Sequence, residues 1–505
     1  MRRLLPLLPA LGAAVVLALG APATSSASAT QEAMFQDDNQ LIYTTRDSLD
    51  ARLDTLKALG VDRIRATILW YAIAPDGLSR TKPSFDATNP DDYATGIWDH
   101  YDALVEDAYA RGIKVNFDVT GPSPLWANRT PPRPDIADNY EPSPSEFAQF
   151  VTAVGRRYSG SWPDPIYPAA TIPRVDYWSI WNEPNASGWL TPTWQRSGKT
   201  WYERSASLYR ELADAAYGAL TGTGHGSDTI LFGDTAPAGN GSKNVKRYMP
   251  PMTFVRALYC VDRRLHRLTG RRAKLLGCGK SPSGFRAAHP VLFKATGFAH
   301  HPYQLLTAPT VKPRDPDIVT MAVLSRLTGA LDTIQRRYSS KRRFPLYLTE
   351  YGYQTPPDPL GVPLLTQAAY LNQSEFIAAR NPRVRSLAQF LLYDDGAPVN
   401  KTFQSGLLSH DGRPKPAFAA YQVPAWLYGT GSHRHLWGVL RPAAANAKAT
   451  ARVQYRAPHA KSYRTLRRVT AHGTRNVVRA TIRARRGGSV RILYGKLRSR
   501  TVPVP

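Results

Sequence analysis

Cysteine is almost absent from this 505-residue sequence, which contains only Cys260 and Cys278. A structural zinc site is disfavoured, because it needs more ligands at metal-binding spacing and His266 makes a poor third. Closing the 18-residue loop between the two cysteines with a disulfide contributes about 3 kcal/mol in the chain-entropy model. In an oxidising compartment we expect this disulfide rather than two free thiols.

Several catalytic signatures are missing as well. Gly279-Lys280-Ser281 resembles the end of a phosphate-binding loop, but Lys274 stands where that loop requires glycine. The sequence has no Gly-x-Ser-x-Gly elbow, no His-Glu-x-x-His helix and no dinucleotide fingerprint after its first expected strand. These absences argue against nucleotide-dependent enzymes, serine hydrolases of that type and zinc peptidases, and we expect no metal or organic cofactor.

Long apolar runs are confined to the N-terminus, where residues 4–23 follow Arg2 and Arg3 and lead into Ala27-Ser28-Ala29. This order of a basic, an apolar and a small-residue region is typical of a signal peptide. Three prolines interrupt the apolar region, which disfavours a membrane anchor. We therefore predict a signal peptide over residues 1–29 and a secreted, extracellular protein without a transmembrane anchor, exported by either the Sec or the twin-arginine route.

Acidic residues are missing from the end of the chain, since residues 431–505 contain 18 Lys and Arg but no Asp or Glu. The net charge of the whole chain is +27, so only +9 lies before this segment. The segment could bind an anionic polymer such as a cell-wall polymer, serve as a packing module with a solvated basic face, or bind nucleic acid. Export and the lack of stacking aromatic residues argue against nucleic acid.

Short apolar runs alternate with longer amphipathic segments from residue 33 onward, as in repeated strand-then-helix units. Eight such units predict an α/β fold, the (β/α)8 or TIM barrel, whose catalytic residues lie at the carboxyl ends of the strands. The strands are expected at Ala33–Gln36, Arg63–Leu69, Lys114–Val119, Val175–Trp181, Thr229–Phe232, Gly297–His301, Leu346–Glu350 and Ser386–Leu392.

The barrel pattern ends near Tyr428, and Gly429 and Gly431 mark a junction. Short β runs at regular spacing follow, which predicts a small C-terminal all-β sandwich. The predicted organisation is a signal peptide at residues 1–29, a barrel at 30–428 and a basic sandwich at 432–505.

Two glutamates stand at the ends of expected strands. Trp178-Ser179-Ile180-Trp181 leads directly into Asn182-Glu183-Pro184, and Leu346-Tyr347-Leu348-Thr349 leads into Glu350. On a barrel both carboxyl groups face one cleft. Paired carboxylates of this kind suit glycoside hydrolysis, where one carboxylic acid protonates the leaving oxygen and the other carboxylate attacks the anomeric carbon or activates water.

The pattern resembles the clan A glycoside hydrolases, with families 5 and 39 as the nearest resemblance among secreted actinobacterial forms. The resemblance covers roughly residues 33–428. It is carried by Asn182-Glu183-Pro184 on the fourth strand, Glu350 on the seventh, Arg65 on the second, His301-Pro302-Tyr303 on the sixth, and Ser405-Gly406-Leu407 with Asp411-Gly412-Arg413-Pro414-Lys415-Pro416-Ala417 after the eighth.

This resemblance implies a retaining mechanism with Glu183 as acid/base and Glu350 as nucleophile. It implies further that Asn182 binds the sugar 2-hydroxyl and that Tyr303 donates a hydrogen bond to Glu350. His301 and Arg65 would orient the same nucleophile, and a nearby Arg would lower its pKa.

The resemblance fails at the eighth strand, where the clan usually has a tryptophan and this sequence has Tyr393 followed by Asp394 and Asp395. Tyr393 is our candidate replacement for that tryptophan, and this difference bears on the substrate more than on the chemistry. Trp70 and Trp126 are expected to line the cleft, because sugar rings bind flat aromatic surfaces. Further rim candidates are Trp189, Trp194, Tyr351 and Tyr353.

We therefore expect a monomer that acts on a carbohydrate substrate. An inverting or transglycosylating enzyme using the same carboxylates is an alternative. A catalytically silent carbohydrate-binding barrel is the alternative from another class, although both glutamates are intact.

Overall fold

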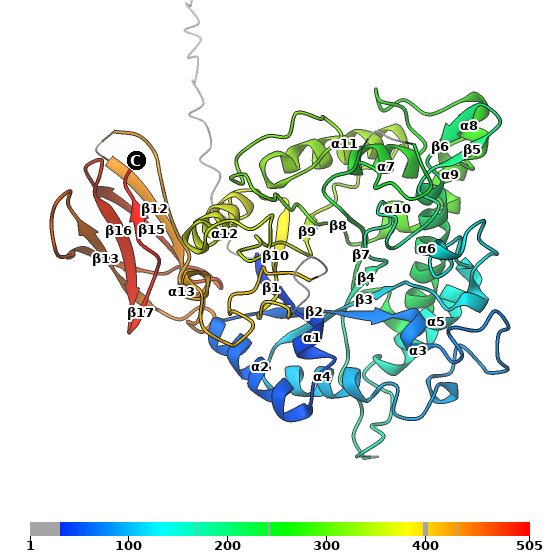
Figure 1. Cartoon of the computed structure of the whole chain (residues 1–505), viewed down its shortest axis with the longest axis horizontal. Coiled ribbons are helices and arrows are strands. Elements are labelled where there is room, and N and C mark those ends of the chain that lie inside the picture. The colour runs from blue at the N-terminus through cyan, green and yellow to red at the C-terminus, as the bar shows by residue number, and fades with distance from the viewer. Residues whose placement is uncertain (1–30, 168, 241–242, 397–401, 432) are drawn as a thin grey trace, which may run out of the picture.

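The computed structural model describes residues 31–505 apart from 168, 241–242, 397–401 and 432. The predicted signal peptide lies outside the described residues. Figure 1 shows a large α/β domain beside a smaller β domain that contains the C-terminus. None of the helices in the described ranges is long and apolar enough to span a membrane.

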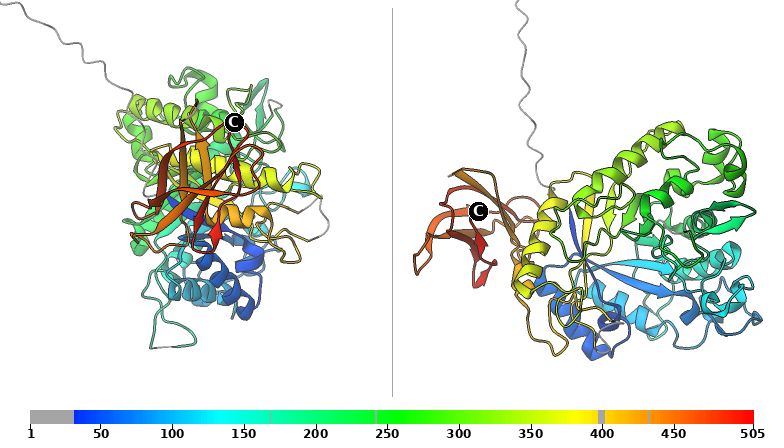
Figure 2. Two further views of the ribbon diagram at one scale, coloured as in Figure 1. Left: turned by 90° about the vertical axis from the view of Figure 1, so that its left-hand side faces the viewer. Right: turned by 45° about the horizontal axis from the view of Figure 1, so that its top comes forward.

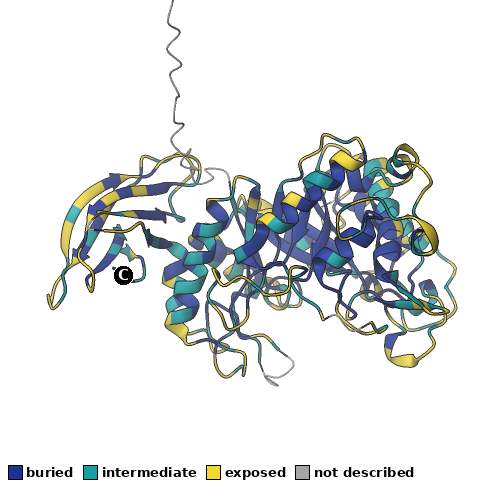
Figure 3. Cartoon of the chain, turned by 90° about the horizontal axis from the view of Figure 1, so that it is seen from above, coloured by how far each residue is buried: buried dark blue, intermediate teal, exposed yellow. Residues whose placement is uncertain are grey.

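Eight parallel strands close the large domain into a barrel in the order β1-β10-β9-β8-β7-β4-β3-β2. Each coincides with an expected strand to within a few residues, so the predicted TIM barrel is confirmed. The strands are almost fully buried, as Figure 3 shows, because helices cover the barrel and side chains fill it. Their bounds are β1 Glu32–Gln36, β2 Arg63–Leu69, β3 Lys114–Thr120, β4 Tyr177–Ile180, β7 Thr229–Thr235, β8 Gly297–His300, β9 Leu346–Leu348 and β10 Val384–Phe390.

The surrounding helices begin and end at residues that favour these positions. Thr45 and Ser143 cap the N-termini of α2 and α5 with side-chain hydrogen bonds, and Pro144 opens α5. Gly60 ends α2 at a φ of +77°, the left-handed region that favours glycine. The main helices are α2 Arg46–Leu59, α4 Asp99–Ala110, α5 Pro144–Arg157, α6 Arg204–Leu220, α11 Leu324–Arg337, α12 Leu364–Ala379 and α13 Pro416–Gln422, with short α1 Asp38–Leu41 and α3 Trp70–Ile73.

Long insertions follow β4 and β7 on the carboxyl side of the barrel. The first contains a two-stranded hairpin, and the second contains four short helices and the Cys260–Cys278 disulfide. The Cα atoms of the two cysteines are 5.7 Å apart, and the predicted disulfide is confirmed. The inserted elements are β5 Gln195–Ser197, β6 Thr200–Tyr202, α7 Pro251–Leu258, α8 Gly270–Leu275, α9 Pro282–Ala288 and α10 Val291–Lys294.

The C-terminal domain is a β-sandwich of two antiparallel sheets, as predicted. One sheet has the order β11-β12-β15, and the other has β14-β13-β16-β17 with β18 paired to β16. Strand β11 precedes the glycine junction at residues 429–431, yet it pairs with β12 along its whole length. The strands are β11 Ala425–Tyr428, β12 His433–Val439, β13 Thr450–Arg456, β14 Arg464–Thr470, β15 Val477–Arg483, β16 Ser489–Tyr494, β17 Leu497–Arg498 and β18 Val502–Pro503.

The sandwich packs on α12 and on the loop that enters β2, away from the carboxyl ends of the strands (Figures 1 and 2). Arg441 makes an ion pair with Glu375 of α12 at 2.7 Å, and Arg475 makes one with Asp62. The carbonyl group of Arg441 approaches Gly60 so closely that no Cβ atom would fit there. Apolar contacts between the two domains involve Phe376, Ala379, Trp437, Val439 and Val477.

Candidate active site

Glu183 and Glu350 lie where β4 and β9 end, on the carboxyl rim of the barrel. Trp181 and Glu183 have left-handed φ values of +65° and +36°, which costs energy for residues with a side chain. Two backbone hydrogen bonds to neighbouring strands hold this turn, from Trp181 N–H to Val119 O and from Glu183 N–H to Asp234 O, both 3.0 Å. The chain is thus bent to turn Glu183 over the barrel opening.

The two carboxyl groups face each other across His301. One oxygen of Glu183, one of Glu350 and one ring nitrogen of His301 lie within 4.8 Å of one another. His301 Nδ1 is 2.9 Å from Glu183 Oε1 and 3.6 Å from Glu350 Oε2. His301 therefore lies beside Glu350, as expected, and is in closer contact with Glu183.

Glu350 receives hydrogen bonds on both oxygens. Arg65 Nη1 donates to Oε1 at 2.8 Å, and the Tyr303 hydroxyl donates to Oε2 at 3.1 Å. Burial raises the pKa of Glu350 above its ordinary value, while His301 and Arg65 act in the opposite direction. The donors favour the ionised carboxylate that a nucleophile needs.

Arg65 is the fully buried centre of the polar network beneath the pocket. Besides Glu350, its guanidinium donates to Gln36 Oε1 at 2.6 Å and to Asn182 Oδ1 at 2.9 Å. It also lies 2.9 Å from Asp118 Oδ2. The structure therefore brings Asn182, Arg65, His301 and Tyr303 together with both glutamates, as the sequence predicted.

Two aspartates of this network were not predicted. Asp118 on β3 and Asp234 on β7 are both fully buried, and Asp234 Oδ1 lies 3.3 Å from His301 Nε2. Burial, above all, raises the pKa of Asp118 to about 8, although Arg65 opposes it. Burial also acts to raise the pKa of Asp234, but Arg65 and His301 outweigh it and lower that pKa. Alternation along the strand was the available signal, since Asn116, Asp118 and Thr120 point to one side of β3.

A pocket of 450 Å³ opens over these groups. Polar side chains of Gln36, Asp38 and Asn182 line it together with Glu183 and Glu350. Aromatic side chains form much of the remaining wall, as a site for sugar rings requires. They are Tyr43, Trp189, Tyr248, Tyr303, Tyr353, Phe390 and Phe403.

The sequence matches no known family model and no curated protein. Comparison of structures does find similar barrels. A family 39 glycoside hydrolase from the gut symbiont Bacteroides cellulosilyticus WH2 superposes with a TM-score of 0.51 at 15% sequence identity, over 92% of this chain and 81% of that chain. The barrel has the fold of a glycoside hydrolase. Thus the resemblance to clan A is confirmed at the level of the fold.

Two further glycoside hydrolase structures are similar at lower TM-scores. A glucosidase from Croceicoccus marinus has a TM-score of 0.48 and 13% identity over 87% of this chain and 90% of that chain. A monomeric beta-xylosidase from Caulobacter crescentus CB15 has a TM-score of 0.45 and 16% identity over 95% of this chain and 98% of that chain.

Three aromatic residues expected in the cleft of this glycoside hydrolase fold do not line the pocket described above. Trp70 opens α3 and is buried against Phe150, with the ring centroids 5.9 Å apart. Trp126 packs edge-on against Trp70. Tyr393 lies under the guanidinium of Arg52 at 4.4 Å. Each of these three rings packs against an aromatic or cationic neighbour. Of the further rim candidates, Trp189 and Tyr353 do line the pocket.

The Glu183–His301–Glu350 cluster has the residue types of a metal site. Its donor set does not fit one. Burial lowers the pKa of His301, but Glu350, Asp234 and Glu183 outweigh burial and raise that pKa to about 10. A protonated imidazole has no lone pair for a metal, and Arg65 already neutralises Glu350.

The raised pKa of His301 predicts a pH-dependent stability. Because His301 is protonated in the folded state up to pH about 10 but titrates near 6.5 when unfolded, its stabilisation is complete below about pH 6.5 and is lost as pH rises toward 10. We expect the free energy of unfolding to fall between pH 7 and 9.5 in the wild type and to fall less in His301→Gln. Urea denaturation measures this, with the exposed His100→Gln as control. Equal slopes for all three proteins would contradict it.

Proposed function

We propose that the protein is a retaining glycoside hydrolase that cleaves an O-glycosidic bond by double displacement. The observation that carries this proposal is the pair of carboxyl groups, Glu183 and Glu350, with oxygens within 4.8 Å at the base of one pocket. Retaining enzymes have carboxyl groups about 5–5.5 Å apart, whereas inverting enzymes need about 6.5–9.5 Å to admit a water molecule. The spacing therefore supports retention over inversion.

In the first step, a Glu350 oxygen forms a bond to the anomeric carbon as the bond to the leaving oxygen breaks. Glu183 gives its proton to that oxygen, so the leaving group departs as a neutral alcohol. In the second step, Glu183 takes a proton from water, and the resulting hydroxyl displaces Glu350 from the anomeric carbon. Two inversions restore the original configuration.

The neighbouring residues support these steps. Arg65 and Tyr303 hold the Glu350 carboxylate by its two oxygens and favour its ionised form, against the burial that raises its pKa. Asn182 lines the pocket and is fixed by Arg65, which leaves its amide group to bind the sugar 2-hydroxyl. His301 Nδ1–H donates to Glu183 and fixes the direction of that carboxyl group.

The acid/base role of Glu183 predicts a dependence on the leaving group. In Glu183→Ala, we expect kcat for an alkyl glycoside to fall by about 10²–10⁴-fold, the usual contribution of general acid catalysis. A glycoside with a strongly acidic phenol as leaving group needs no proton, so its first step is expected to keep most of its rate. Pre-steady-state kinetics on both substrates measures this difference. An equal loss on both substrates would remove Glu183 from the role.

Retention itself is tested by NMR of the anomer first released. Release of the inverted anomer would exclude double displacement, and transfer of the sugar to added alcohol in place of water would identify the transglycosylase alternative. A wild-type protein that binds oligosaccharides but turns over none of a broad glycan panel would identify the silent barrel.

We propose a carbohydrate substrate without acidic groups, because three carboxyl groups, Asp38, Glu183 and Glu350, line the pocket. A sugar carboxylate placed among them would be repelled. We also propose, on the basis of the N-terminal sequence pattern, that the protein is exported to the extracellular space. We keep the expectation that it works as a monomer. Mass spectrometry of the exported protein tests cleavage before Thr30.

We propose further that the sandwich binds an anionic cell-wall polymer through a basic face, defined by Arg452, Arg456, Arg468 and Arg491 on β13, β14 and β16. Arg452 and Arg468 stand directly opposite each other on neighbouring strands, where like charges repel. No acidic residue in 431–505 offsets them. A polymer with regularly spaced phosphate or carboxylate groups would relieve this repulsion, and arginine binds both groups well.

This binding predicts salt-dependent retention on anionic cell-wall material. We expect Arg452→Gln/Arg468→Gln to elute at lower salt than the wild type, because fewer counterions are displaced. The exposed barrel pair Lys312→Gln/Arg314→Gln removes the same charge and is the matched control. Elution of both double variants at the same salt concentration would contradict a specific face. Preferential retention on DNA would favour the nucleic-acid alternative.

A further inference from the structure

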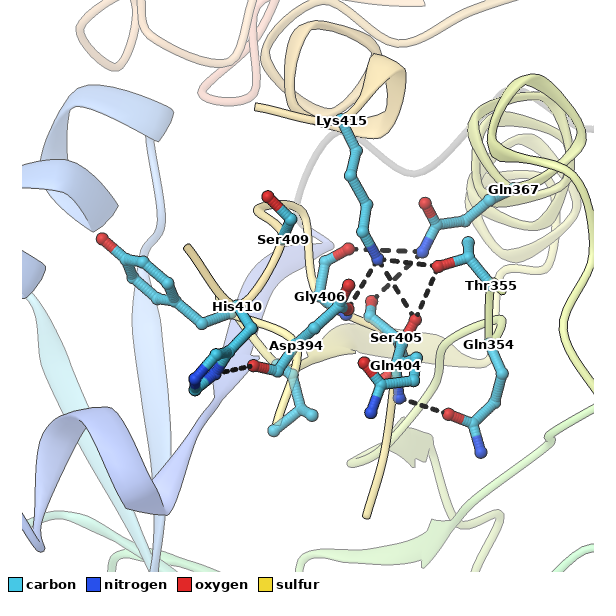
Figure 4. Close-up of polar contacts among 12 residues, drawn as sticks. Gln354, Thr355, Gln367, Asp394, Gln404, Ser405, Gly406, Ser409, His410 and Lys415 are labelled. Atoms are coloured by element: carbon cyan, nitrogen blue, oxygen red, sulfur yellow. Dashed lines mark hydrogen bonds and ion pairs between the residues drawn. The ribbon is translucent and has the colours of Figure 1, made fainter. Parts of the chain in front are cut away.

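A buried ion pair closes the chain segment that follows β10. Lys415 Nζ lies 2.6 Å from Asp394 Oδ1, and the two side chains are only 5% and 6% exposed (Figure 4). Lys415 belongs to the run that resembles the clan pattern after the eighth strand. No residue of this run has a role in the double displacement described above. Lys415 is more than 20 positions from Asp394 in the sequence, so the ion pair joins the two ends of one loop.

All three ammonium hydrogens of Lys415 have acceptors. Besides Asp394, Nζ donates to Thr355 Oγ1 at 2.9 Å and to the Gln404 carbonyl oxygen at 3.2 Å. Thr355 lies in the loop that follows β9, and Gln404 lies in the loop that follows β10. One side chain therefore ties together segments from the seventh and eighth strand-to-helix loops, as Figure 4 shows.

These two loops form the pocket wall beside Glu350. Gln354, Phe403 and Ser405 all line the pocket. The loops also contact each other directly, since Gln404 N–H donates to Gln354 Oε1 at 2.5 Å and Thr355 N–H donates to Gln404 O at 3.0 Å. Lys415 itself is absent from the residues lining that pocket, so it acts on the wall from behind.

Side chains other than Lys415 hold the same wall, but less completely. Gln367 of α12 donates to the carbonyl groups of Tyr353 and Ser405, at 3.0 and 3.3 Å. Gln389 of β10 donates to Ser405 O at 2.9 Å. Neither reaches Thr355 or Gln404 O through the hydrogen bonds of the described residues. Thr355 and Gln404 O bond to each other, through Thr355 N–H at 3.0 Å and Thr355 Oγ1 at 3.1 Å, and Lys415 adds a charged donor that both share. The Asp394 carboxylate, in turn, accepts the Gly406 N–H at 2.9 Å.

We propose that Lys415 is a positioning residue for the substrate pocket, which holds Gln354, Phe403 and Ser405 at the distance from Glu350 that a sugar ring requires. This inference rests on the proposed glycosidase function. A shift of about 1 Å in such a wall is enough to change substrate binding strongly. The planar guanidinium of arginine cannot reproduce three divergent hydrogen bonds from one nitrogen atom.

The test compares Lys415→Met, Lys415→Arg and Asp394→Asn/Lys415→Met with the wild type. The double variant removes both charges, so it leaves no unpaired buried charge and keeps the test open if a single variant does not fold. The exposed Lys341→Met is the matched control. Titration of active sites with a fluorinated glycosyl label corrects every rate for the folded, active fraction.

We expect the double variant and Lys415→Arg to raise KM by about tenfold or more per titrated site, while kcat for a substrate with a good leaving group stays within threefold. A merely structural role would instead lower the number of titratable sites and leave KM unchanged, which would overturn the proposal.

Hydrogen–deuterium exchange gives a readout that does not need turnover. We expect faster exchange in residues 352–355 and 402–406 of the double variant, with β13 and α5 unchanged. Uniformly faster exchange, or none in the two wall segments, would overturn the proposal. If the wild type cleaves no glycoside, the proposed function fails, and the exchange pattern still decides whether Lys415 holds the wall.

Discussion

Glu350→Gln is expected to lower kcat/KM on a cleaved glycoside by roughly 10⁴-fold or more, the scale of losses when a covalent nucleophile is removed. Glutamine keeps the shape of the side chain. Its amide oxygen can accept from Arg65, while its amide NH2 faces the Tyr303 hydroxyl oxygen. It cannot form the ester to the anomeric carbon, so the first displacement is lost. The melting temperature is expected to stay close to that of the wild type, because the buried amide still accepts a hydrogen bond from Arg65.

Steady-state kinetics and intact-protein mass spectrometry measure this effect. The exposed Glu211→Gln on α6 is the matched control, and it should keep wild-type rates. A fluorinated glycoside is expected to add one sugar mass to the wild type, on the peptide that contains Glu350, and none to the variant. Turnover by Glu350→Gln within tenfold of the wild type, or labelling of another residue, would show that the nucleophile lies elsewhere.

Arg65→Met is expected to destabilise the fold by about 3–5 kcal/mol, the usual cost of removing one partner from a buried charge pair. The guanidinium is fully buried and lies within 4.0 Å of Asp118, Asp234 and Glu350. Without it, these carboxyl groups face one another with only His301 as a cation. Activity is expected to fall as well, because Glu350 loses the donor on one of its two oxygens.

Urea denaturation measures the stability of Arg65→Met, and a second substitution separates charge from packing. Asp234→Asn in the Arg65→Met background removes a carboxylate whose pKa Arg65 and His301 lower, and it is expected to restore part of the lost stability without restoring activity. A variant with wild-type stability would show that the carboxyl groups are neutral and that Arg65 is needed only for its shape. No recovery from the second substitution would assign the loss to packing.

The barrel and the positions of Glu183 and Glu350 at strand ends could be predicted from the sequence because their signals are local. An apolar strand that leads into Asn182-Glu183-Pro184 marks both the strand and its end. The same holds for Glu350. Once both strand ends are placed on one rim, the closeness of the two carboxyl groups follows from the topology alone.

The remaining features depend on side-chain direction, which spacing along the chain does not determine. Trp70 follows a strand end, as a cleft residue should, but the turn into α3 directs its ring toward α5 and away from the opening. Asp118 and Asp234 belong to different strands, and only the closed barrel brings both to Arg65. Lys415 could be found as part of a motif, whereas its three acceptors come from segments up to 60 positions away.

The place of β11 has a consequence for how the two domains can be separated. This strand precedes the junction but completes a sheet of the sandwich, and Asn372 of α12 fixes its first residue by accepting the Ala425 N–H at 3.1 Å. Cutting the chain at residue 431 would leave β11 without its partner strand β12 and would expose Phe376 on the barrel. The sandwich, cut at this point, is therefore not an independent domain that can be fused to another enzyme. Barrel and sandwich should therefore melt in one cooperative transition.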